Sequence, residues 1–283
     1  MARGAGTGVR GAGRLRSDIV APAVGRLEAD QQFAQDISKV VNPIKKLAKD
    51  EKLDEDVWPP IIEDKAPEAG RNPAAIALAS ELRARSKATS ADIFPQFLRL
   101  AAELDGKMEG TEYRLKTTDS LTRKIEKDAY DEAISLAKAA EKIGDAARFT
   151  VSFPNDKVYE GVVGIIKGLE AKGFKIDKIK NFWERGDSYD GFNIQVLDKN
   201  GVKSELQIHS RESFDIKTRG HVLYEQFRIS QDDDYRSAVD VAMVDFARNV
   251  PKPANYEKLL AIGKLSRMDF RPLNPNYKRP TEQ

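Results

Sequence analysis

Basic side chains recur at regular spacing in one short part of the chain. Arg114 and Lys116 are two residues apart, so on an extended segment they share one face. Ser120, Lys124 and Lys127 follow at positions i, i+4 and i+7, so on a helix they form one stripe. Four cations, a hydroxyl group and a helix N-terminus around one concavity would hold a polyphosphate. The alternative is an amphipathic helix whose basic face is solvated.

Two acidic positions further along the chain offer carboxylates. Asp145 lies just before a hydrophobic segment that begins at Arg148, where an Asp is usually a cap or turn residue. Polar and apolar residues alternate from Glu205 onward, so Glu205, Gln207 and His209 share one face of a strand. Such a face is either the solvent side of a sheet or part of a site. Nucleotide phosphoryl transfer needs a divalent cation, and Mg²⁺ prefers one or two carboxylates with phosphate oxygens.

Composition excludes several other kinds of active site. The 283 residues include no Cys and only two His, which excludes disulfides, thiolate nucleophiles, iron–sulfur clusters, Cys-ligated zinc and His-rich metal sites. The 47 Lys and Arg nearly balance the 45 Asp and Glu, for a net charge of +2, so any electropositive site must be local. The remaining chemistry belongs to carboxylates, hydroxyls, amides and cations.

Helical and strand patterns alternate from about residue 112 onward. They predict an α+β fold with a mixed, roughly five-stranded sheet flanked by helices, behind a helical N-terminal region. Asn200-Gly201 predicts a hairpin between the last two strands. The predicted strands are 148–153, 175–183, 191–198 and 203–210, with an extended segment at 113–116, and the predicted helices are 120–142, 158–172, 212–228, 235–247 and 256–262.

The chain is predicted to have four parts. Residues 1–26 are a flexible basic arm, 27–111 a helical region with an acidic linker, 112–250 the α+β domain, and 251–283 a Pro-containing basic tail. The acidic stretch, residues 50–64, is interpreted as a solvated linker, with an acidic lid over a basic site as the alternative.

Two scaffold helices are predicted before the α+β domain. One begins at Asn72-Pro73, and the other spans residues 92–104. No apolar stretch approaches the roughly 20 residues of a membrane span, and residues 1–26 lack the apolar segment of an export signal.

The three motifs, in this order, resemble those of the RelA/SpoT-type alarmone synthetases over about residues 112 to 228. The basic motif looks like their ATP-binding signature, with Lys127 where an Arg is common. The resemblance implies a nucleotidyltransferase-like fold in which Arg114 stacks on adenine. It also implies that Lys116, Ser120, Lys124 and Lys127 hold the phosphates.

The resemblance extends to the carboxylates. Asp145 looks like the family's metal-binding Asp, and Arg148 like the Arg that follows it, although the family often separates them by four residues. The segment from Glu205 to Ser210 resembles the family's Glu-x-Gln-x-Arg/His-Thr/Ser strand. The implied cofactor is Mg²⁺ on Asp145 and Glu205, with Glu205 orienting or deprotonating a ribose 3′-OH.

The acceptor motif departs from the family's Asn-Gly-Tyr-x-Ser-x-His. Here Gly191 matches, Phe192 keeps a ring at the Tyr position, and Ile194 and Val196 replace Ser and His. Tyr189 offers a second ring. An aromatic ring stacks on any base, so guanosine nucleotides, adenosine nucleotides and the 3′ end of tRNA all stay open as acceptors. The resemblance assigns acceptor binding to Tyr189, Phe192, Gln207 and His209.

The implied activity is transfer of pyrophosphate from ATP to the 3′-OH of a purine nucleotide, with release of AMP. A tRNA acceptor would be favoured by a basic surface beside the site, for which residues 252–279 are the candidate. The chain looks like the small or toxic family members. The resemblance implies action in the bacterial cytoplasm, with delivery into a target cell as an effector in some cases. It also implies an antitoxin or immunity protein as a partner. The alternative of another class is a catalytically dead nucleotide-binding module.

Overall fold

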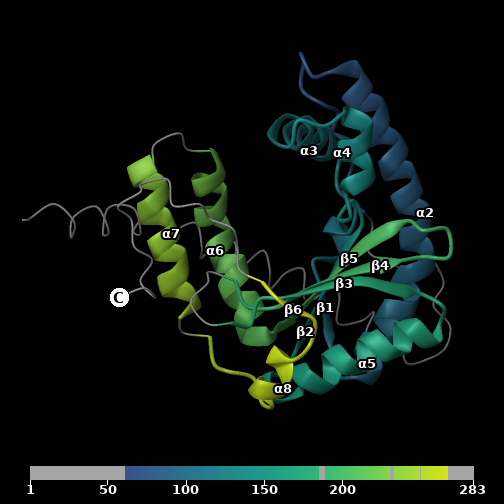
Figure 1. Cartoon of the computed structure of the whole chain (residues 1–283). Helices are drawn as coiled ribbons and strands as arrows, with labels where there is room; N and C mark the ends of the chain where they lie inside the picture. Colours follow the sequence, from purple (N-terminus) through teal and green to yellow (C-terminus); the bar gives the residue numbers. More distant parts are fainter. Residues whose placement is uncertain (1–60, 185–188, 230–232, 249, 267–283) are drawn as a thin grey trace, which may run out of the picture.

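The computed structural model describes residues 61–184, 189–229, 233–248 and 250–266. A central sheet has α2 and α5 on one side and the α6–α7 pair on the other, while α3 and α4 stand beyond one end of the strands (Figure 1). The elements are α2 (Pro73–Glu103), β1 (Lys107–Glu109), the 3₁₀ turn η2 (Thr111–Tyr113), α3 (Thr118–Asp131), α4 (Leu136–Lys142), β2 (Arg148–Phe153), η3 (Asn155–Lys157), α5 (Val158–Ala171), β3 (Lys175–Asn181), β4 (Phe192–Leu197), β5 (Lys203–Ser210), α6 (Arg211–Ile229), α7 (Asp233–Ala247), α8 (Tyr256–Leu260) and β6 (Lys264–Leu265).

The sheet has six strands in the order β1-β2-β5-β4-β3-β6, so the α+β prediction is confirmed. The central pair β2 and β5 is parallel, and β4 pairs antiparallel with both β5 and β3. The two edge strands β1 and β6 were not predicted, because three and two residues are too few to show an alternating pattern. All four long strands fall within the predicted ranges.

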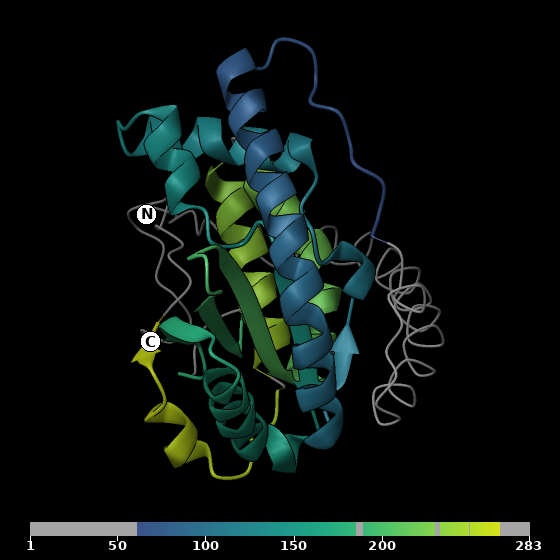
Figure 2. The same cartoon turned by 90° about the vertical axis from the view of Figure 1, so that its right-hand side faces the viewer.

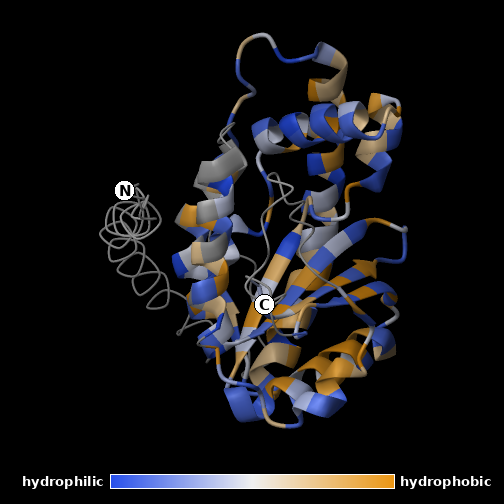
Figure 3. Ribbon diagram, turned by 60° about the vertical axis from the view of Figure 1, so that its left-hand side comes forward, coloured by the Kyte–Doolittle hydropathy of each residue, from blue (hydrophilic) through white to orange (hydrophobic). Residues whose placement is uncertain are grey.

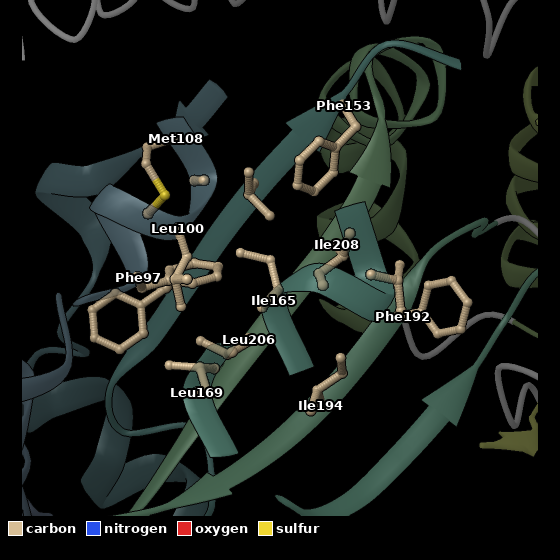
Figure 4. Packing of buried hydrophobic residues seen from close by; sticks show 14 of the residues in the cluster. Phe97, Leu100, Met108, Phe153, Ile165, Leu169, Phe192, Ile194, Leu206 and Ile208 are labelled. Carbon is tan, nitrogen blue, oxygen red and sulfur yellow. The ribbon is translucent and has the colours of Figure 1, made fainter. Parts of the chain in front are cut away.

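The apolar face of the sheet builds the core against α2 and α5. Phe149, Val151 and Phe153 alternate along β2 and are buried, as are Leu206 and Ile208 on β5. Their side chains interleave with those of the two helices (Figure 4). Because successive strand residues point to opposite faces, the residues between them must lie on the other side of the sheet.

Helix α2 is one continuous helix of 31 residues rather than the two predicted helices. It passes through Pro95 unbroken and forms a single long rod (Figure 2). Between the two predicted helices, Ser86 and Thr89 lie on the buried face of α2. Thr89 Oγ1 donates a hydrogen bond of 2.9 Å to Asp198 beyond β4, so a tertiary contact holds the predicted gap in helical form.

The single helix predicted over 120–142 is in fact two helices, α3 and α4. Ala133 adopts a left-handed conformation with φ of 52°, which ends the first helix. Ser135 then caps the second, its hydroxyl accepting from the Lys138 N–H at 3.2 Å. The apolar positions run through both helices, so hydrophobic periodicity alone did not show the break.

Part of the prediction lies outside the described residues: the arm, the helical region and acidic stretch up to residue 60, and the tail from 267 onward. The four-part division of the chain stays a prediction. Within the described ranges, no helix is both long enough and apolar enough to cross a lipid bilayer.

Candidate active site

The polar face of the sheet carries the predicted carboxylate motif. Arg148 and Thr150 on β2 lie opposite Glu205 and Gln207 on β5, because the two strands pair in parallel register. Polar and apolar colours alternate along these strands (Figure 3). Helix α6 packs against β2 and β5 and brings Lys217 to this face, where it bonds Gln207. The face is therefore part of a polar site, and not a solvated surface.

Asp145 is bound by two lysines of the basic motif. Lys116 Nζ lies 2.5 Å from Asp145 Oδ2, and Lys124 Nζ lies 3.1 Å from Oδ1. Backbone bonds position the first contact: the Lys116 N–H donates to the Ala146 carbonyl at 2.9 Å and the Arg148 N–H to the Arg114 carbonyl at 2.8 Å. The segment 114–116 thus runs beside the start of β2, and α3 supplies Lys124. Motifs that are distant in sequence meet here as predicted.

The two carboxylates have opposite electrostatic environments. Burial alone would raise the pKa of Asp145, but the charges of Lys116 and Lys124 outweigh burial and lower it to about 2. Burial, and then the charge of Asp145, raise the pKa of Glu205 above its ordinary value. One carboxylate is thus held ionised while its neighbour binds a proton more readily. Paired carboxylates with divergent pKa values are an arrangement suited to acid–base chemistry.

The cations around this pair differ in how they are held. Burial lowers the pKa of Lys116, whereas Asp145 raises that of Lys124 despite burial. The positive charge of Arg148 acts against the net rise in the pKa of Glu205 and helps to lower the pKa of Lys217. Arg148 is therefore one of the charged groups of the site. Ser120 is half-buried on α3. Lys116 and Lys124 therefore contact Asp145, while Arg148 lies opposite Glu205 on the neighbouring strand.

Two residues of the basic motif lie elsewhere. Lys127 is one turn beyond Lys124 with its side chain 69% exposed, and it pairs with Asp131 on its own helix. Arg114 is only 6% exposed; its guanidinium lies 4.9 Å from the ring centre of Phe94, and Nη1 donates to the Thr111 carbonyl at 2.8 Å. Burial lowers the pKa of Arg114 to about 10. The stacking of Arg114 on adenine stays a prediction. In this structure its guanidinium lies over the ring of Phe94.

The prediction that Phe192 binds the acceptor is wrong. Its side chain is 0% exposed and packs in the core with Ile194 and Val196, so it cannot stack on an acceptor base. Side chains alternate between the two faces of β4, so Asn193 and Gln195 lie on the polar face. Their partners on β5 are Gln207 and Glu205, respectively. Matching the family's motif put Phe192 at the Tyr position. The period-two pattern of Phe, Ile and Val already indicated that this set faces the core.

His209 is also buried, at 0% exposure, so the prediction that it binds the acceptor is wrong. Its Nδ1 lies 2.8 Å from the Asp190 carbonyl and its Nε2 lies 3.1 Å from the Tyr189 hydroxyl. Tyr189 also donates to Asn193 Oδ1 at 2.7 Å. Burial, and then the charge of Lys217, lower the pKa of His209 well below its ordinary value, so the ring is neutral. It secures the loop before β4, and base stacking by the half-buried Tyr189 stays a prediction.

Gly191 matters because the His209 ring packs on it. A Cβ added at Gly191 would lie 2.7 Å from two atoms of that ring. We expect Gly191→Ala to destabilise the protein by about 1–3 kcal/mol, the usual cost of overpacking. Denaturant unfolding measures this change.

The matched control is Gly220→Ala on α6. A Cβ there meets nothing within 4 Å, and the position is helical. The control should raise the free energy of unfolding by about 0.5–1 kcal/mol. Equal effects at the two positions would contradict the packing argument.

The end of the acidic stretch contacts the basic motif's helix. Asp64 accepts hydrogen bonds from the Thr118 N–H at 2.7 Å and from Thr118 Oγ1 at 2.6 Å, and pairs with Arg83 at 3.2 Å. Asp64 thereby satisfies an N–H group in the first turn of α3, which that turn otherwise leaves unpaired. Asp64 thus contacts the start of α3 and Arg83, and both interpretations of the acidic stretch stay predictions.

The described part of the basic tail lies away from the carboxylates. The Lys252 carbonyl accepts from Asn155 Nδ2 at 2.9 Å, and Lys258 lies 5.6 Å from the ring of Tyr159. Asn155 follows the C-terminal end of β2, whereas Arg148 begins that strand. These tail lysines are therefore at the far end of β2 from Glu205.

Asp145 and Glu205 fit Mg²⁺ as two carboxylate ligands whose coordination is completed by oxygens of a bound phosphate. Among the described residues, no three acidic or His side chains cluster closely enough to form a metal site of their own. Asp145 and Glu205 supply two carboxylates, close enough for the charge of one to raise the pKa of the other. Two carboxylates completed by substrate phosphate oxygens are the usual environment of Mg²⁺ in nucleotide enzymes.

Comparisons with known proteins find similarity in structure alone. No protein-family model matches the chain, and neither does any curated protein sequence. Small alarmone synthetase 1 from Bacillus subtilis is 15% identical, with a TM-score of 0.43 over 68% of this chain and 96% of that one. The type VI effector Tas1, solved with its immunity protein, is 21% identical, with a TM-score of 0.40 over 60% and 96%.

A third match is a GTP pyrophosphokinase family protein from Streptococcus pneumoniae. It is 16% identical, with a TM-score of 0.37 over 65% of this chain and 87% of that one.

Proposed function

We propose that the protein is an ATP-dependent pyrophosphokinase that transfers pyrophosphate to the 3′-OH of a purine nucleotide. The observation that carries this proposal is the contact of Asp145 with both Lys116 and Lys124 of the basic motif, together with Glu205, whose pKa is raised while that of Asp145 is lowered. The acceptor 3′-oxygen attacks the β-phosphorus of ATP, the bond from that phosphorus to the α-phosphate oxygen breaks, and AMP leaves. The 3′-OH proton passes to Glu205.

Each residue has a role that its environment supports. Glu205 is the base, because burial makes it a better proton acceptor than an ordinary carboxylate. Lys116, Lys124 and Arg148 bind the triphosphate and neutralise negative charge on the transferred group, with Ser120 beside them. Asp145 and Glu205 would hold Mg²⁺, which when bound polarises the phosphate oxygens. Catalysis then rests on positioning and electrostatics.

The test is chromatography of the products formed from purified protein and ATP with each acceptor in turn: GDP, GTP, ADP, ATP and bulk tRNA. The expected result is AMP together with a nucleotide that carries two additional phosphates. Labelled RNA instead would identify a tRNA acceptor. ATP binding without AMP in any mixture would contradict the proposal and support a catalytically dead nucleotide-binding module.

The proposal extends to the setting in which the reaction takes place. Pyrophosphate transfer consumes ATP with each turnover, so we propose that the protein is a toxin of the bacterial cytoplasm, delivered there as an effector. Its producer would then need an immunity protein. Growth arrest on expression that depends on Glu205 is the expected outcome, and arrest that persists in Glu205→Gln would contradict a toxic role for the reaction.

A further inference from the structure

Gln207 uses both ends of its side-chain amide inside the protein. Lys217 Nζ, on α6, donates to Gln207 Oε1 at 2.6 Å. Gln207 Nε2 donates in turn to Glu205 Oε1 at 2.9 Å. The side chain of Gln207 is 5% exposed, so it contacts these groups rather than solvent. Gln207, expected from sequence to bind the acceptor, instead links α6 to the proposed base.

The donor and acceptor chemistry fixes the direction of this link. An ammonium group only donates hydrogen bonds, and an ionised carboxylate only accepts them. When Lys217 is protonated, the amide oxygen therefore faces Lys217 and the amide nitrogen faces Glu205. The opposite orientation would set oxygen against carboxylate and nitrogen against ammonium. Thr150 Oγ1 also donates to the amide oxygen, at 3.4 Å, which favours the same orientation.

Lys217 is held firmly where it makes this contact. Its ammonium group lies 5.5 Å from the ring centre of Phe214 and 6.0 Å from that of Tyr189. Burial and the charge of Arg148 lower its pKa, to about 7, while Glu205 and Glu109 act in the opposite direction. The hydrogen bond of Lys217 Nζ goes to Gln207, so the geometric link from Lys217 to Glu205 runs through that amide.

We propose that Lys217 is a positioning residue for Glu205 that acts through Gln207. Lys217 orients the amide, the amide holds Oε1 of Glu205, and Oε2 is left to take the proton of the 3′-OH. This inference rests on the proposed function, because it assigns Glu205 the role of base. Without Lys217 the amide oxygen keeps only its longer contact with Thr150, so the amide holds Glu205 less firmly.

The test compares wild type, Lys217→Met, Gln207→Leu and the double variant in AMP release. Each single change should lower kcat by about 10- to 100-fold, since a displacement of about 1 Å in a catalytic group costs that much. KM for ATP and for the acceptor should stay within about twofold. The double variant should be no slower than the slower single variant, because both changes break the same link. Arg211→Met, an exposed cation on the same helix, is the control.

An unchanged kcat in Lys217→Met would overturn this role. So would a double variant in which the losses in kcat of the two single variants multiply. A large rise in KM for the acceptor would instead make Lys217 a substrate ligand. Denaturant unfolding of the same four proteins tests the contact without substrate, and stabilities that simply add would contradict it. An inactive wild type with coupled stabilities would refute the proposed function alone. If Lys217→Met does not fold, Lys217→Gln replaces it in every comparison.

Discussion

Glu205→Gln is expected to lower the rate of AMP release by about 10³-fold, within the range usual for a lost general base. The amide keeps the shape of the carboxylate but accepts no proton and carries no charge for a cation. Glu205 is half-buried on the polar face of β5 and accepts a hydrogen bond from Gln207, so the change alters chemistry more than packing. ATP affinity should stay within a fewfold, because the triphosphate ligands are on other elements.

Initial rates of AMP formation and equilibrium dialysis of ATP measure the two quantities separately. Glu170→Gln, an exposed position at the end of α5, is the matched control and should behave as wild type. A Glu205→Gln protein that releases AMP at the wild-type rate would remove Glu205 from the mechanism. A protein that loses ATP binding to the same degree as activity would show that Glu205 serves binding instead.

Asp145→Asn is expected to have the second large effect, on activity and on stability together. Activity should fall by at least about 10²-fold, because the amide neither attracts Mg²⁺ nor balances the two lysines. Stability at neutral pH should fall by about 2 kcal/mol, since the pKa of Asp145 is lowered from 3.8 to about 2. The variant would leave Lys116 and Lys124 close together without their shared counter-charge.

The pH dependence of this stability effect has a definite sign. A carboxylate with a depressed folded-state pKa stabilises the protein fully above its unfolded pKa of about 4, and the stabilisation is lost as the pH falls toward 2. The difference in unfolding free energy between wild type and Asp145→Asn should therefore shrink over that window. Asp156→Asn, an exposed residue in η3, is the control. A difference that is constant with pH would contradict the ion pairs.

The strands were predictable because each is long enough to show its own pattern. β2 and β5 have six and eight residues, and the predicted and observed bounds coincide. The predictions failed where tertiary contacts decide: α2 continues through a polar stretch because Thr89 reaches Asp198, and the helix predicted over 120–142 breaks at Ala133. Local propensity does not encode such distant or strained contacts.

The sequence also indicated which charges belong together. Spacing alone put Lys116 and Lys124 near one concavity, and the resemblance added Asp145 and Glu205. Lys217, Asn193 and Gln195 were missed as site residues. A period-two reading of β4 would have found Asn193 and Gln195, because that strand's apolar residues fix which face is buried. Lys217 lies in the run that continues the resemblance after Ser210, but the sequence did not show its role, because it meets Gln207 only where α6 folds back over β2 and β5.

By itself, the sequence determined the class of chemistry: no thiols and almost no imidazoles, but cations, hydroxyls and carboxylates in an order that suits polyphosphate transfer. The tertiary structure decided which of those groups act together. It bound Asp145 between two lysines, buried Phe192 and His209, and turned Gln207 toward Glu205. Residue type is a local property, whereas pKa, burial and hydrogen-bond direction depend on neighbours that the chain supplies only when folded.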